Sequence, residues 1–259
     1  MAMRRILFVL ADLLVLNAQL CTEIPNPGLL KQIDAGNGLV VGLEPTGNVF
    51  MLNGEDWLYL AGGMKHVSVG ISGIWMVDYD KNIYRLIGSN LEKVSESFEH
   101  IDAGGNLFVA GIKSDTHPVC LPSSEFLAMK PSSSVTWTDI QLISGTMKSL
   151  SCGLQGCWGV NTAGSVYFRA GMEPHRCQGT RWDYIPSTFS MIDVGSDGNV
   201  YGMKKGGDVY HRDGITDSKA SGTRWIKVNS INARAKHLTY DANILWLITQ
   251  DDKILRCQM

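Results

Sequence analysis

The chain has 259 residues, of which 19% are charged and 28 are glycine, and its formal net charge is −2 at pH 7. This length accommodates a barrel or a set of repeats as one domain. The near-neutral charge and the lack of a basic stripe with interleaved aromatic residues argue against nucleic acid or an anionic membrane as a partner.

The chain begins with the features of a secretory signal peptide. Two arginines precede a mainly apolar stretch, residues 6–16, which is too short to span a bilayer. Ala18 offers a small residue for cleavage, so we expect a signal peptide at residues 1–18 and a secreted, extracellular domain at residues 19–259. Asp12 interrupts the apolar stretch, and a buried strand or helix is the alternative.

A four-residue pattern, here called motif one, recurs along the rest of the chain. It consists of an apolar residue, any residue, a small or apolar residue and then Gly. Its copies are IDAG at 33, VSVG at 67, IDAG at 101, LSCG at 150 and IDVG at 192, with a degenerate sixth copy, LTYD, at 238. The fourth positions of these copies advance by 34, 34, 49, 42 and 46 residues. A period near 40 predicts a stacked or radial array of six repeats.

Two further elements follow motif one in these repeats. A second motif, such as VVGLEPTGNVFML in repeat one, comes within about ten residues. A third element begins with Trp in four repeats. In two of them this Trp is the last residue of the same tetrapeptide, GTRW. Short runs of Val, Ile, Tyr and Trp between Gly, Asn and Asp turns indicate β-strands. We therefore expect an all-β fold, a six-bladed β-propeller, with an open β-solenoid as the alternative.

The two ends of the chain suggest how the ring closes. Repeat six ends at Cys257 and lacks its own Trp strand, so the segment CTEI at 21–24 is expected to supply the missing outer strand. Cys21 and Cys257 would then be neighbours. A bridge between them would stabilise the fold by about 5 kcal/mol in the chain-entropy model.

The domain contains six cysteines, an even number that suggests disulfides in a secreted chain. Six thiols allow 15 pairings, and the spacing alone does not choose among them. A zinc site is the competing interpretation, but only Cys152 and Cys157 are close in sequence, and no second pair answers them.

The repeats resemble tectonin repeats, and the chain from Cys21 to Cys257 is similar to the fish-egg lectins. The segments that carry the resemblance are LKQIDAG, KHVSVG, SCGLQGCWGVN, SMIDVGSDGNVYG and ILWL, in this order. The resemblance implies a six-bladed propeller that binds N-acetylglucosamine and microbial surface glycans. It also implies that calcium can be carried, although no cofactor is required, and that the chain can form homo-oligomers.

The resemblance also implies a disulfide pattern. It pairs Cys21 with Cys257, Cys120 with Cys177 and Cys152 with Cys157. A further disulfide of the family's last repeat is missing here, because Ser230 and Thr249 occupy its positions. The last blade is therefore expected to be looser.

No pattern of an enzyme is present: the chain lacks HExxH, GxSxG and a Walker loop. The carboxylate pairs Asp78/Asp80 and Asp251/Asp252 fall in the same turn of two repeats, where acids usually bond nearby backbone. Three histidines share one repeat position before the inner strand, which favours packing over a metal cluster. They are His66, His100 and His237. We therefore expect a binding protein and not an enzyme.

A sugar site needs hydrogen-bonding groups and an apolar wall in a shallow groove. The residue that ends the second strand is polar in several repeats, and further polar or aromatic residues crowd this turn in repeat two. The candidate sugar-binding residues are therefore Glu44, Asp78, Tyr79, Asp80, Asn82, Asn161 and Lys204. The alternative is that they are solvated turn residues.

The sequence thus favours a multivalent lectin that coats or agglutinates, in innate defence or egg protection. Its expected partners are glycans with N-acetylglucosamine and bacterial surface polysaccharide, without insertion into a membrane. The rival hypothesis is a secreted scaffold that binds proteins through long loops. These loops, expected together on one face, are residues 123–136, 171–181 and 213–224.

Overall fold

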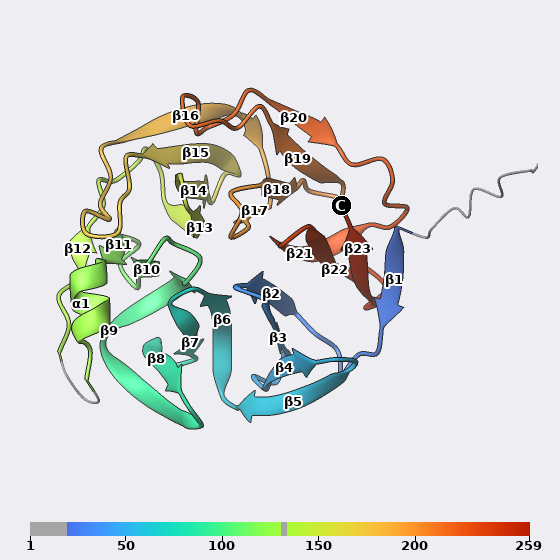
Figure 1. Cartoon of the computed structure of the whole chain (residues 1–259), viewed down its shortest axis with the longest axis horizontal. Helices are drawn as coiled ribbons and strands as arrows, with labels where there is room; N and C mark the ends of the chain where they lie inside the picture. The colour runs from blue at the N-terminus through green and yellow to red at the C-terminus, as the bar shows by residue number, and fades with distance from the viewer. Residues whose placement is uncertain (1–19, 131–133) are drawn as a thin grey trace, which may run out of the picture.

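The computed structural model describes residues 20–130 and 134–259, which form a ring of β-sheets around a central axis (Figure 1). The expected signal peptide, residues 1–18, lies outside the described part. One short helix, α1 (Ser123–Ala128), lies on the outside of the ring. Within the described ranges, no helix has the length and apolar character needed to cross a membrane.

Three sheets each hold one complete repeat in four antiparallel strands, ordered from the axis outward. Repeat one contains β2 (Gln32–Gly36), β3 (Leu39–Leu43), β4 (Val49–Asn53) and β5 (Asp56–Ala61). Repeat four contains β13 (Met147–Gly153), β14 (Gly156–Asn161), β15 (Ser165–Ala170) and β16 (Arg181–Thr188). Repeat five contains β17 (Met191–Val194), β18 (Val200–Met203), β19 (Val209–Asp213) and β20 (Arg224–Lys227).

Repeats two and three share one seven-stranded sheet. Its strands are β6 (Met64–Gly70), β7 (Gly73–Asp78), β8 (Asn82–Ile87), β9 (Asn90–Asp102), β10 (Val109–Lys113), β11 (Pro118–Leu121) and β12 (Thr138–Asp139). Strand β9 is the outer strand of repeat two, beside β8, and continues as the inner strand of repeat three, beside β10. The expectation of six separate four-stranded blades is wrong here. The segment NLEKVSESFEHID contains no Gly or Pro that would end a strand, and the chain bends at Glu96 (φ 105°) instead.

The sheet of repeat six combines the two ends of the described chain. It contains β21 (Ala235–Asp241), β22 (Ile244–Thr249), β23 (Ile254–Gln258) and, as its outer strand, β1 (Cys21–Ile24). Strand β1 pairs antiparallel with β23, and Cys21 lies opposite Cys257. The two strands lie side by side at the edge of the ring in Figure 1.

Three disulfides join the six cysteines in the pairs that the resemblance implies: Cys21–Cys257, Cys120–Cys177 and Cys152–Cys157. The first covalently joins the outer pair of strands in repeat six. The second ties β11 to the loop after β15. The third closes the hairpin of β13 and β14, in which the two cysteines are directly opposite each other.

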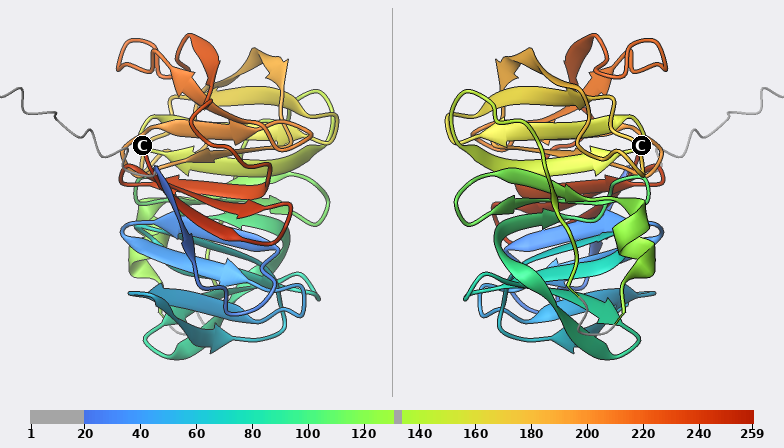
Figure 2. Two further views of the ribbon diagram at one scale, coloured as in Figure 1. Left: turned by 90° about the vertical axis from the view of Figure 1, so that its right-hand side faces the viewer. Right: turned by 90° about the vertical axis from the view of Figure 1, so that its left-hand side faces the viewer.

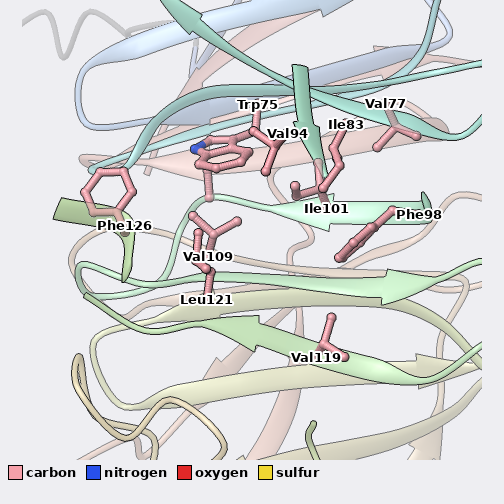
Figure 3. Close-up of a cluster of buried hydrophobic side chains, with 11 residues drawn as sticks. Trp75, Val77, Ile83, Val94, Phe98, Ile101, Val109, Val119, Leu121 and Phe126 are labelled. Atoms are coloured by element: carbon pink, nitrogen blue, oxygen red, sulfur yellow. The ribbon is translucent and has the colours of Figure 1, made fainter. Parts of the chain in front are cut away.

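The hydrophobic core lies between neighbouring repeats. One cluster, drawn in Figure 3, combines Trp75 and Ile83 of repeat two with Phe98, Val109 and Leu121 from β9, β10 and β11. All five side chains are fully buried. Burying one such side chain stabilises a fold by about 1.5–3 kcal/mol, so packing of this kind holds repeats two and three together.

The recurrence of GTRW has a structural cause. Gly179 opens the first copy with φ 61°, and a Cβ there would meet the carbonyl oxygen of Ala170 at 2.7 Å. The next residue, Thr180, donates its N–H and its hydroxyl to that same carbonyl at 2.8 and 3.2 Å. The copy at 222–225 makes the same contacts in repeat five. The tetrapeptide therefore closes the same loop in two repeats.

The strands run roughly along the ring axis, so the connections gather on two opposite faces (Figure 2). The turn face carries the turns between second and third strands, at 44–48, 78–82, 113–117, 161–165, 204–208 and 249–253. The loop face carries the connections between first and second strands and the long segments 171–181 and 213–224. On the loop face, Gln155 Nε2 contacts Asp217 Oδ1 at 3.4 Å.

Candidate functional site

The second residue of motif one forms a closed belt of hydrogen bonds around the axis. In every repeat its side-chain oxygen accepts the backbone N–H of the third motif residue in the next repeat. The acceptor and donor pairs are Asp34 and Val69 (2.6 Å), Ser68 and Ala103 (3.0 Å), Asp102 and Cys152 (3.0 Å), Ser151 and Val194 (3.0 Å), Asp193 and Tyr240 (2.8 Å), and Thr239 and Ala35 (2.9 Å). Carboxylates and hydroxyls alternate around the belt.

The degenerate sixth copy of motif one has a role of its own. Its last residue, Asp241, replaces the Gly of the other copies and is buried. One carboxylate oxygen accepts the N–H and the hydroxyl of Ser196 in repeat five, and the other accepts the N–H of Gly38 in repeat one at 3.1 Å. Asp241 therefore bridges the two neighbours of repeat six.

The axial carboxyl groups do not fit a metal site. Burial raises the pKa of Asp193 to about 6. Burial and the charge of Asp193 raise the pKa of Asp34 and of Asp102 well above the ordinary value. Their oxygens are engaged by backbone N–H groups. Among the described residues, no set of three or more His, Cys, Asp or Glu side chains could hold a metal ion. We therefore assign no calcium ligands.

A hollow of about 470 Å³ opens at the turn-face end of the axis, and we call it the axial bowl. Its floor is formed by the three aspartates of the belt. Its rim carries four lysines, all at the position two residues before motif one: Lys31, Lys65, Lys148 and Lys236. The bowl is therefore basic at its rim and acidic at its base.

The three histidines predicted to pack in the scaffold form the wall of the bowl. His66 and His100 bond the backbone carbonyl oxygens of Ile101 and Leu150 in the next repeats, at 2.8 and 2.7 Å, so both have a structural role. Burial lowers the pKa of His66 well below the ordinary value, and those of His100 and His237 to about 4. All three rings are neutral at physiological pH.

The turn of repeat two brings four of the candidate sugar-binding residues together. Asp78 Oδ1 accepts the backbone N–H of Asn82 at 2.8 Å, while Oδ2 accepts from Asn82 Nδ2 and from the hydroxyl of Tyr84 at 2.8 and 3.0 Å. The Asp78 carboxylate therefore holds the turn. Tyr79 and Asp80 are exposed at its tip.

Two of the equivalent residues in other repeats, Glu44 and Asn161, also hold their turns. Glu44 Oε2 accepts bonds from Thr46 and Asn48 at 2.9 and 2.8 Å. Asn161 is buried, and its Oδ1 accepts two backbone N–H groups of the turn. The ammonium group of Lys204 lies 4.5 Å from the centre of the Tyr210 ring. The circular arrangement of the repeats therefore places each of these residues in a different turn and does not bring them together at one point.

Tyr79 is the most accessible aromatic group of this turn, with 54% of its surface exposed. Its hydroxyl donates to the carbonyl oxygen of Pro45 at 2.9 Å and accepts from Lys31 Nζ at 3.3 Å. Tyr79 thus leans across from repeat two to repeat one. Because its partner Lys31 is one of the rim lysines, the Tyr79 ring lies beside the rim of the axial bowl.

Two further hollows lie outside the axial bowl. One, at the loop-face end of the axis, is lined by the exposed side chains of Ile71 and Leu154. The other is a groove of about 740 Å³ between repeats five and six, which Ser230 and Thr249 line. Thr249 Oγ1 accepts the N–H of Lys253 at 2.9 Å, so this residue holds the turn between β22 and β23.

The belt and the rim lysines were not predicted from the sequence. A signal for both was present, because the polar second position of motif one and the lysine two residues before it recur at fixed places in LKQIDAG, MKHVSVG, MKSLSCG and AKHLTYD. Recurrence at one repeat position places side chains on one circle around an axis. The spacing alone did not show which hollow that circle would line.

Comparisons with known proteins agree with this architecture. Residues 29–250 match the model of the tectonin domain family. Over 238 residues the chain is 34% identical to the fish-egg lectin of Cyprinus carpio, a match that covers 92% of this chain and 98% of the lectin.

Solved structures share the fold at low sequence identity. Virginiamycin B lyase from Staphylococcus aureus has a TM-score of 0.60 and 12% identity, and the match covers 92% of this chain and 98% of that one. YCF48 from Cyanidioschyzon merolae has a TM-score of 0.55 and 13% identity, and covers 87% and 81%. Such identities show the fold alone. On the match to the family model and to the fish-egg lectin, the chain belongs to the tectonin-domain family of the fish-egg lectins.

Proposed function

We propose that this protein is a secreted lectin, a multivalent carbohydrate-binding protein and not an enzyme. The observation that carries the proposal is the 34% identity to the fish-egg lectin of Cyprinus carpio along nearly the whole length of both chains. Three disulfides in the described residues support an extracellular, oxidising location. The ligands are glycans with N-acetylglucosamine, including those of microbial surfaces, which suits a role in innate defence or egg protection.

The sugar site that the geometry supports best is the turn of repeat two. Tyr79 offers an exposed ring as the apolar wall, and Asp80 beside it offers a carboxylate that accepts bonds from sugar hydroxyls. Asp78 and Asn82 hold this turn in shape through their mutual bonds. The remaining candidates, Glu44, Asn161 and Lys204, mark equivalent sites in other repeats.

Several weak sites on one face explain how such a protein would act on a surface. The turns of six repeats circle the axis on the turn face, so all of them can meet one glycan-coated surface at once. Linking weak sites raises avidity by roughly 10²–10⁴ over a single site. The proposed activity is therefore coating or agglutination, which a homo-oligomer would strengthen.

Chromatography on an N-acetylglucosamine matrix tests this proposal. The mature chain should be retained and should elute with free N-acetylglucosamine but not with an equal concentration of a sugar without an acetamido group. Passage without retention would contradict the proposed specificity.

The rival function is a scaffold that binds proteins through the loop face. Leu127 of helix α1, with 69% of its surface exposed, is the observation in its favour. Retention on the same matrix that free sugar does not reverse would favour the scaffold over the lectin.

A further inference from the structure

We propose that the axial bowl is an anion site that binds a phosphate group carried by a glycan. This inference rests on the proposed lectin function for the sugar part of the ligand, and the bowl lies beside the turn of repeat two, whose Tyr79 hydroxyl accepts a bond from the rim lysine Lys31. The hollow of about 470 Å³ falls within the range of roughly 300–1,000 Å³ that is usual for small-molecule sites.

The charges around the rim are unequal. Glu99 is shared by Lys65 at 2.5 Å and Lys81 at 2.6 Å, and Lys236 pairs with Asp252. In the described residues the ammonium groups of Lys31 and Lys148 contact only neutral oxygens, those of Tyr79 and of the Ser190 backbone. Of the four rim lysines, Lys65 and Lys236 are therefore paired with carboxylates, while Lys31 and Lys148 are left to attract an anion to the rim.

The chemistry of the rim favours phosphate over carboxylate. The rim cations are lysines, whose compact ammonium groups bind phosphate as point charges. A planar carboxylate is matched best by the fork of an arginine, and no arginine lines the bowl in the described part of the chain. Cations that converge from several repeats surround a tetrahedral group better than a planar one.

The floor gives the ligand an orientation. Burial raises the pKa of Asp34 and Asp102 well above the ordinary value, and that of Asp193 to about 6, which reduces the negative charge beneath the bowl. The carboxyl groups of Asp34 and Asp102 each accept a backbone N–H through one oxygen and keep further lone pairs that can accept bonds from sugar hydroxyls. A phosphate would therefore lie at the level of the rim lysines, with the sugar ring directed toward the belt.

Isothermal titration of the mature chain tests the site with N-acetylglucosamine, N-acetylglucosamine 6-phosphate, inorganic phosphate and glucuronic acid. We expect the 6-phosphate to bind at least about tenfold more tightly than N-acetylglucosamine, the low end of what a charge-assisted bond contributes. Inorganic phosphate should compete with the 6-phosphate for the site, and a higher salt concentration should weaken the binding of the 6-phosphate. Equal affinity for the two acetylated sugars would overturn the proposal. Glucuronic acid binding as tightly as the 6-phosphate would overturn the assignment to phosphate.

Two matched double variants locate the effect. Lys65→Gln with Lys148→Gln removes two rim cations without touching Tyr79, and it should abolish the tenfold gain. Lys93→Gln with Lys219→Gln makes the same change of net charge at exposed positions away from the bowl, and it should retain the gain. An equal loss in both double variants would mean a general charge effect and would overturn the site. Melting temperatures within about 2 °C of wild type, as surface substitutions usually give, show that each variant is folded.

The same proteins are passed over the N-acetylglucosamine matrix, which separates the two proposals. Retention of the wild type without a preference for the 6-phosphate would refute the axial site and leave the lectin function standing. A lysine-dependent preference for the 6-phosphate without retention would refute the sugar specificity and support the axial site.

Discussion

Thr239 Oγ1 accepts the backbone N–H of Ala35 at 2.9 Å, and this bond joins the last repeat to the first. The same hydroxyl donates to Asp193 Oδ2 at 3.0 Å, so one side chain connects repeats five, six and one. The belt around the axis is closed by this residue. Without it, the belt of hydrogen bonds would be interrupted between repeats six and one.

Thr239→Val tests the value of that closure, because valine keeps the shape but loses the oxygen. The buried N–H of Ala35 would lose its acceptor, so we expect the free energy of unfolding to fall by about 1–3 kcal/mol. Urea unfolding measures the change. Thr188→Val, at an exposed position of β16, is the control and should change it by less than about 0.5 kcal/mol. Equal effects of the two substitutions would contradict the role of the belt.

The glycines of motif one should not tolerate a side chain. A Cβ on Gly70 would lie 2.1 Å from the carbonyl oxygen of Ala103 in the next repeat. Gly70→Ala should therefore destabilise the fold by about 1–3 kcal/mol or more through overpacking. In Gly62→Ala the nearest atom is the hydroxyl of the exposed Tyr59, which can move away. Thermal unfolding should separate these two substitutions, and a similar melting temperature for both would refute the argument.

Asp193→Asn should change how stability depends on pH. Burial raises the pKa of Asp193 to about 6, so the folded state holds this proton more tightly than the unfolded chain does. The protonated acid stabilises the fold fully below about pH 3.8, its ordinary pKa, and this contribution is lost as the pH rises through 6. Each tenfold difference in proton affinity between the folded and unfolded states corresponds to about 1.4 kcal/mol. The unfolding free energy of the variant relative to wild type should therefore rise between pH 4 and 7.

The wall histidines act in the opposite direction. Burial lowers the pKa of His100 and His237 to about 4, so their contribution to stability is lost as the pH falls from about 6.5 toward 4. This contribution is the same in both proteins and cancels in the difference between them. Urea unfolding of both at pH 4, 5, 6 and 7 measures that difference. A difference that stays constant with pH would show that Asp193 does not titrate in this range.

Tyr79→Ala should weaken sugar binding without weakening the fold. The ring is largely exposed, so its loss removes the proposed apolar wall but little buried area. We expect roughly tenfold weaker binding at this site and earlier elution from the N-acetylglucosamine matrix. Tyr184→Ala, an exposed tyrosine on the outer strand β16, should elute like wild type. Unchanged elution of Tyr79→Ala would place the site elsewhere.

Asp78→Ala is predicted to lower the stability of the fold and to weaken retention on the N-acetylglucosamine matrix. It removes the acceptor of three bonds that hold the turn, so the free energy of unfolding should fall by about 1–3 kcal/mol. Asp80→Ala removes the neighbouring carboxylate without these bonds. If Asp80→Ala binds sugar like wild type while Tyr79→Ala binds it more weakly, the ring of Tyr79 and not the Asp80 carboxylate makes the main contact with the sugar.

The repeats, the β-class and the pairing of the two end strands could be predicted because they depend on recurring local patterns. The fusion of repeats two and three could not, since nothing in the segment 90–102 marks where one blade ends and the next begins. The role of Asp78 was harder to predict. Its sequence position is that of a ligand-facing turn residue, while its oxygens are engaged within the turn, which only atomic positions reveal.

The bridge between Cys21 and Cys257 turns most of the chain into a covalent macrocycle. A protease that cuts a single exposed loop of this circle opens it but releases no fragment, because both new ends remain attached through the disulfide. The cut protein would stay one covalent molecule, heavier only by the water taken up in the cleavage, until the disulfide is reduced. A fold whose ends are joined in this way survives the first cleavage as one molecule, which would suit the secreted role proposed above.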